Sequence, residues 1–183
     1  SNLYTLDLDD NQLTVLPENL SAMSQLSWIY VSENQLSEIP ESLFDNSNIQ
    51  ILDFSFNNLL ELPDRFDELP LLFEFHCSHN QISQIPESFS TSTNVIFVNF
   101  ANNNLSTLPA DFSALNNLMS LNLAENLFTN FPIEIFGLSE LRQLYLHNNQ
   151  IDEFPAELTS LGLQKLDLSN NNISSITETI GEM

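Results

Sequence analysis

Apolar residues recur along the chain with a period of 23 residues, shortened once to 22 near Gly162. Eight units fill the sequence, and positions are counted from the first apolar residue of each unit: Leu3, Leu26, Ile49, Leu72, Val95, Leu118, Leu141 and Leu163. The shared pattern is L-x-x-L-x-L-x-x-N-x-L-x-x-L-P-x-x-L-x-x-L-x-x. A unit this short cannot bury its apolar face alone, so the pattern predicts that neighbouring units stack around one continuous core.

Each unit predicts the same local elements. Alternation around the fourth and sixth positions predicts a strand whose fourth- and sixth-position side chains point into the core. Cys77 occupies one sixth position, so we expect a buried small hydrophobe there and not a reactive thiol. Asn stands at the ninth position of all eight units, where its amide is expected to hydrogen-bond backbone groups at the turn that follows the strand.

The second half of seven units carries Pro, which predicts the start of a return segment. An acidic residue follows each Pro by one or two positions, and we expect these acids to lie in the first turn of a short convex helix, where negative charge is favourable. They are Glu18, Glu41, Asp64, Glu87, Asp111, Glu134 and Glu157.

This pattern resembles the leucine-rich repeat family, in the 23-residue form that occurs in intracellular scribble-type and Ras-suppressor-type proteins. The resemblance covers the whole chain. It implies an α/β solenoid of eight repeats, a curved horseshoe segment with a parallel β-sheet on its concave face and short helical, 3-10 or extended segments on its convex face. We expect a single domain over residues 1–183. Because neither end shows a polar or cysteine-rich cap, we also expect this domain to be a segment of a larger protein.

The strand register predicts which side chains face a partner. Third- and fifth-position residues point out of the concave sheet, so Trp28 and Tyr30 stand exposed while Ile29 and Val31 are buried. Strands lie about 4.8 Å apart, so the outward residues of units two to five are expected to gather into one patch. The predicted partner-binding residues, which include seventh- and eighth-position neighbours and one residue of unit seven, are Trp28, Tyr30, Ile51, Asp53, Phe56, Glu74, His76, His79, Phe97 and Tyr145.

The patch has two interpretations. Large apolar side chains rimmed by acids are typical of protein-binding hot spots. Alternatively, aromatic residues simply suit strands and cover the stems of their neighbours.

Charge and composition exclude several partners. The formal net charge is -22, from 25 acidic and 3 basic residues, so the chain lacks the Lys/Arg footprint that a nucleic acid or an anionic membrane requires. No apolar stretch approaches the roughly 20 residues needed to cross a bilayer. The single cysteine rules out an internal disulfide framework and favours a cytoplasmic location. Glycosylation sequons at Asn19, Asn104 and Asn172 keep an extracellular location open.

No catalytic or metal-binding pattern is present in the sequence. His76, His79 and His147 share the concave face, but they lack the spacing of a ligand set, and we expect no metal and no cofactor. Asp7, Asp9 and Asp10 are expected to form a solvated acidic edge. The three glycines form no phosphate-binding loop, and no exposed Cys is paired with a His, so we expect no enzyme activity.

The sequence therefore favours a non-enzymatic domain, expected to be monomeric, that binds a protein partner through the concave face of repeats two to five. One alternative is the regulatory or targeting arm of a signalling enzyme that carries a phosphatase, cyclase or GTPase domain. Others are an extracellular recognition ectodomain and an acidic inhibitor or chaperone of a basic protein.

Overall fold

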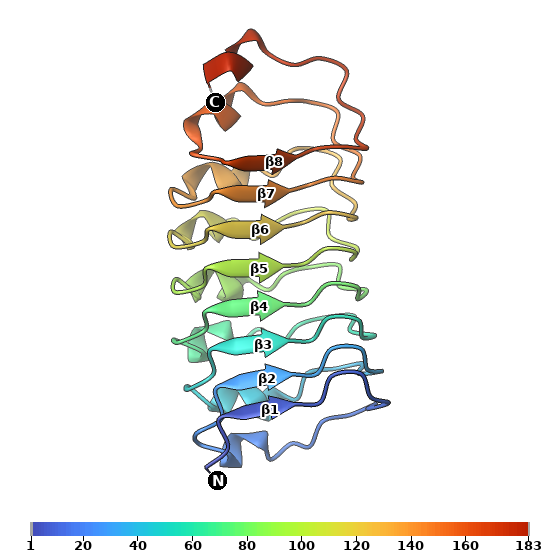
Figure 1. The fold of residues 1–183 in the computed structure, drawn as a ribbon, viewed down its shortest axis with the longest axis vertical. Helices are drawn as coiled ribbons and strands as arrows, with labels where there is room; N and C mark the ends of the chain where they lie inside the picture. Colours follow the sequence, from blue (N-terminus) through green and yellow to red (C-terminus); the bar gives the residue numbers. More distant parts are fainter. Residues whose placement is uncertain (1, 183) are drawn as a thin grey trace.

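The computed structural model describes residues 2–182 as eight stacked coils, one per sequence unit. Each coil contributes one three-residue strand, and the strands pair in chain order into a single parallel sheet (Figure 1). The strands are β1 (Thr5–Asp7), β2 (Trp28–Tyr30), β3 (Ile51–Asp53), β4 (Glu74–His76), β5 (Phe97–Asn99), β6 (Ser120–Asn122), β7 (Gln143–Tyr145) and β8 (Lys165–Asp167). The sheet does not close on itself, and the predicted eight-repeat horseshoe is confirmed.

The return half of every repeat contains a short 3-10 turn, and successive turns pack side by side. The turns are η1 (Leu20–Ala22), η2 (Glu41–Asp45), η3 (Phe66–Glu68), η4 (Glu87–Thr91), η5 (Phe112–Ala114), η6 (Ile133–Gly137), η7 (Ala156–Ser160) and η8 (Glu178–Glu182). Turns of three to five residues have little stability of their own, so packing against the core holds them in place.

The acids that follow Pro occupy two different places, which corrects the sequence-based expectation in three repeats. In η2, η4, η6 and η7, Pro is the residue before the turn and the acid lies in the first turn as expected. In the other repeats the turn starts later, so Glu18, Asp64 and Asp111 precede it. Asp64 accepts a hydrogen bond from the Ser88 amide of the next repeat at 3.0 Å, and the Ser88 hydrogen bonds lower the pKa of Asp64.

Buried asparagines connect each repeat to the one before it. Asn103 is 6% exposed; its Oδ1 accepts from the Ile82 amide at 3.0 Å, and its Nδ2 donates to the carbonyl of Cys77 at 2.9 Å and of Phe100 at 3.1 Å. The same bonds recur at Asn34, Asn57, Asn80, Asn126, Asn149 and Asn171. The predicted structural role of the ninth-position Asn is confirmed.

The core consists of the inward strand residues and a run of phenylalanines behind them. Phe66 contacts Phe75 and Phe89 with ring centroids 5.2 and 4.9 Å apart, and Phe89 continues the run to Phe100 and Phe112. Cys77 is fully buried, as the pattern predicts, and burial raises the pKa of its thiol. Within the described residues, no helix is long and apolar enough to span a membrane.

Candidate functional site

Strand pairing places the predicted partner-binding residues in two columns across the sheet. In the third-position column, Trp28 pairs with Ile51, Ile51 with Glu74, and Glu74 with Phe97. In the fifth-position column, Tyr30 pairs with Asp53, and Asp53 with His76. The structure therefore brings these seven residues together on four neighbouring strands, β2 to β5.

The two aromatics at the ends of the third-position column carry the exposed apolar area. Trp28 is 43% exposed and Phe97 is 38% exposed, whereas Tyr30, Ile51 and His76 are half-buried. His76 Nε2 lies 3.2 Å from a carboxylate oxygen of Glu74. Asp53 accepts the amide of Ser55 at 2.9 Å, so one of its oxygens already stabilises the end of β3.

Negative charge surrounds the half-buried phenol of Tyr30 on β2. The pKa of Tyr30 is raised, mainly because the phenol is partly buried. The nearby carboxylates add to this effect, and they are Glu74, Asp53, Asp7 and Asp9. Asp9 also accepts the amide of Ser32 at 2.6 Å, which gives this acid a structural role at the turn after β1. The phenol therefore stays protonated and offers a hydrogen-bond donor inside an acidic rim.

A shallow hollow connects the patch to Tyr145. It has a volume of about 460 Å³ and is lined by Glu74, His76, Phe97, Asn99, Asn122 and Tyr145. Tyr145 belongs to β7 but reaches the same depression as Phe97 of β5. The Lys165 ammonium lies 4.7 Å from the centre of the Tyr145 ring, where cation–π attraction favours it.

Phe56 and His79 lie apart from the strand columns, at the turn that follows each strand. Both have left-handed backbone conformations, with φ of 54° and 53°. Their rings stack nearly parallel, 3.9 Å apart at an angle of 10°. The structure thus places these two predicted partner-binding residues in the turns after β3 and β4, where they form a stacked aromatic pair.

Two exposed apolar residues at the second position of repeats four and six, just before the strands, were not predicted from the sequence. Phe73 is 38% exposed and contacts Phe97 edge-on, with ring centroids 6.2 Å apart. Met119 is 41% exposed and precedes β6. The repeat pattern could have revealed them, because Phe73 and Met119 are apolar residues at a second position that the strand alternation does not place in the core.

Two of the three histidines, His76 and His147, each lie close to one acidic side chain. His147 Nδ1 lies 3.4 Å from an oxygen of Asp167. The pKa of Asp167 is lowered mainly by its hydrogen bonds with Ser169, and to a smaller extent by His147 and Lys165. Over the described part of the chain, no three His, Cys, Asp or Glu side chains lie close enough together to hold a metal ion.

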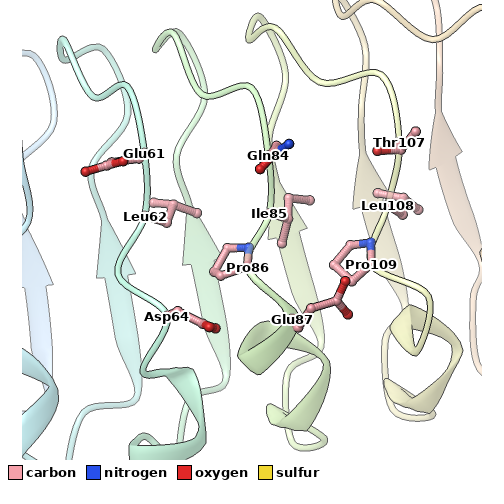
Figure 2. A pocket seen from close by; sticks show the side chains of 10 residues that line it. All are labelled: Glu61, Leu62, Asp64, Gln84, Ile85, Pro86, Glu87, Thr107, Leu108 and Pro109. Atoms are coloured by element: carbon pink, nitrogen blue, oxygen red, sulfur yellow. The ribbon is translucent and has the colours of Figure 1, made fainter.

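A separate acidic groove crosses the return segments between the strands and the 3-10 turns. One stretch of about 420 Å³ has Leu62, Ile85 and Pro86 in its wall and the carboxylates of Glu61, Asp64 and Glu87 around it (Figure 2). A second stretch of about 310 Å³ shares Glu61, Leu62 and Asp64 and adds Glu18, Glu38 and Glu41. The described residues therefore include an aromatic surface on the strands and a separate acidic groove across the return segments.

Comparison with known proteins identifies the family. Family models described as leucine rich repeat match residues 1–59, 24–82, 98–151 and 162–183. This chain belongs to the leucine-rich repeat family. Leucine-rich repeats are commonly protein-interaction modules and typically non-enzymatic, and the matching models indicate no catalytic family. No curated protein matches the chain.

Solved leucine-rich repeat structures have the same fold. A leucine-rich repeat protein of Leptospira interrogans is 31% identical with a TM-score of 0.94, over 99% of this chain and 46% of that chain. The ectodomain of the plant membrane receptor kinase GASSHO1/SCHENGEN3 from Arabidopsis thaliana, solved in complex with CASPARIAN STRIP INTEGRITY FACTOR 2, is 33% identical with a TM-score of 0.89, over 99% of this chain and 23% of that chain. The chain thus spans less than half the length of either relative.

Proposed function

We propose that this leucine-rich repeat domain is a non-enzymatic interaction module that binds a protein partner through the concave face of repeats two to five. The observation that carries the proposal is the third-position column, where strand pairing aligns Trp28, Ile51 and Phe97 with their side chains outside the core. Exposed Trp and Phe on a rigid sheet are suited to binding because they contribute large contact areas at little cost in conformational entropy.

Electrostatics add selectivity to this patch. The acids Asp53 and Glu74 lie within the columns, and the chain as a whole is strongly acidic. A partner with an apolar centre and basic or hydrogen-bonding edges complements such a surface, whereas an acidic partner is repelled. Each anchor aromatic in such an interface typically contributes about 2 kcal/mol or more.

The proposal is tested by capturing partners from source extract with the wild-type domain and with Trp28→Ala/Tyr30→Ala. We expect the partner to be lost with the double variant and retained in high salt, because an aromatic-centred interface is screened little. Leu60→Ala/Ile133→Ala is the matched control, since both residues are well exposed but neither lies on a strand. If the Trp28→Ala/Tyr30→Ala variant still captures the partner and high salt abolishes capture, the concave site is wrong and the partner binds the acidic groove.

We also propose a cytoplasmic location, because the single cysteine, Cys77, is buried and forms no disulfide. Extracellular recognition is the second candidate, because the chain is similar to a receptor ectodomain and the sequon residues Asn19, Asn104 and Asn172 are all exposed. Intact-mass measurement on protein from its native source distinguishes the two. Glycan mass on these asparagines would support the ectodomain.

A further inference from the structure

The turn after each strand contains one residue with a left-handed backbone, and these residues form a ladder along the rim of the sheet. They are Asp10, Glu33, Phe56, His79, Asn102, Glu125, Asn148 and Asn170, with φ between 53° and 56°. Backbone hydrogen bonds fix their order, since the Asn34 amide donates to the Phe56 carbonyl and the Asn57 amide to the His79 carbonyl. Glu33, Phe56 and His79 are therefore consecutive rungs.

Folding alone does not explain a phenylalanine on this ladder. Asn and Asp tolerate the left-handed conformation, whereas a bulky apolar residue there is unusual. Phe56 adopts it while leaving 48% of its surface exposed, so it gains little from burial. Its ring stacks on His79 at 3.9 Å, and His79 is itself only half-buried. An outlier of this kind points to a role outside folding.

The two faces of the Phe56 ring have different surroundings. His79 covers one face of the Phe56 ring, because the two rings are nearly parallel, and Glu33 is the neighbouring rung on the other side of Phe56. Later rungs pair their side chains: Asn102 donates to Glu125 at 2.9 Å, and Asn170 donates to Asn148 at 2.8 Å. Among the described residues, the Glu33 carboxylate has no such partner. The exposed Phe56 ring and the Glu33 carboxylate thus belong to consecutive rungs.

We propose that Phe56 and Glu33 form a subsite for an arginine side chain of the protein partner. A guanidinium is flat enough to lie on the open face of Phe56, and its edge can donate two hydrogen bonds to the Glu33 carboxylate. A lysine ammonium lacks both the planar stack and the forked pair of donors. The inference rests on the proposed function, because it assigns the chemistry of one contact that the same partner makes beside the concave patch.

The test is a titration with acetyl-Gly-Arg-Gly-amide, followed by NMR through the ring protons of Phe56 and His79 and the side-chain protons of the peptide. We expect saturable shifts of both rings and upfield shifts of the arginine δ-methylene protons. The lysine peptide and the uncharged citrulline peptide should bind at least about threefold more weakly, since each loses one of the two interactions.

Two variants assign the binding to these residues. Phe56→Asn places a residue that suits the left-handed backbone, so it should fold with an unchanged or higher melting temperature and lose the arginine-specific shifts. Glu33→Gln should weaken binding about threefold, and Leu60→Asn, which lies off the ladder, should leave it unchanged.

Equal binding of the arginine and lysine peptides, or arginine binding that survives Phe56→Asn, would overturn the subsite. This failure is distinguishable from failure of the proposed function. If Trp28→Ala/Tyr30→Ala abolishes partner capture while the arginine peptide shifts neither ring, the concave interface stands and only the subsite is wrong.

Discussion

At the scale of single residues, identical side chains have different roles according to their burial. Asn103 and Asn104 are adjacent, yet Asn103 is buried and bonds the interior backbone of two repeats, whereas Asn104 is exposed and donates one bond to the Gln81 carbonyl at 3.1 Å. A buried amide or carbonyl that loses its partner cannot recover it from water. The ninth-position asparagines are therefore part of the fold and not of a binding site.

We expect Asn103→Ala to lower the free energy of unfolding by about 3 kcal/mol, because several buried backbone groups lose their partner. Asn104→Ala should cost less than about 1 kcal/mol, since water replaces its exposed bond. Urea denaturation followed by circular dichroism measures both variants. Equal losses in the two would mean that the buried amide contributes nothing beyond a surface hydrogen bond.

At the scale of elements, strands and turns of a few residues depend on what packs between them. The sheet supplies the inward residues of each strand, and the 3-10 turns supply Phe66, Phe89 and Phe112 from the other side. Phe89 is fully buried and has ring contacts with Phe66, Phe75, Phe100 and Phe112. Stability is thus shared between neighbouring repeats, as in other solenoids.

Phe89→Ala should destabilise the domain by roughly 3–5 kcal/mol, the usual cost of removing a buried phenylalanine. Ile133→Ala is the control within another 3-10 turn, because Ile133 is 68% exposed and should change stability by less than about 0.5 kcal/mol. Thermal unfolding of both variants gives the comparison. A small effect of Phe89→Ala would show that the surrounding rings close the cavity.

At the scale of the whole molecule, uncompensated negative charge opposes folding. Arg65, one of three basic residues, is 2.6 Å from Asp45 and 2.7 Å from Glu68, and it lies 3.8 Å from Glu41. Within residues 2–182, the groove acids other than Glu41 form no ion pair with Lys or Arg; they are Glu18, Glu38, Glu61, Asp64 and Glu87. A net charge of -22 destabilises the compact state through self-repulsion, and salt screens this repulsion.

We expect the melting temperature to rise by roughly 5 °C or more between about 0.01 M and about 1 M NaCl, as the Debye length falls from about 30 to about 3 Å. The triple variant Glu38→Gln/Glu61→Gln/Glu87→Gln should show a smaller increase, because it removes three charges from the groove. Differential scanning calorimetry measures both proteins. A salt response that is the same in the variant would exclude the groove as a source of the repulsion.

The repeat, the strand register and the division between core and surface could all be predicted from the amino-acid pattern. These features follow from a side-chain period of two within each strand and of 23 between repeats, so Ile29 is buried and Trp28 is exposed whatever the details of the loops. The structural role of the asparagines and the burial of Cys77 could be predicted for the same reason.

The relative positions of the surface features became visible only in the folded molecule. Periodicity gives no backbone angles, so only the fold showed that Phe56 and His79 lie in left-handed turns and that their rings stack. Stacking of separate coils also brings Tyr145 to the hollow beside Phe97 and joins the acids of successive repeats into one groove. These arrangements depend on distances between coils, which a one-dimensional pattern does not contain.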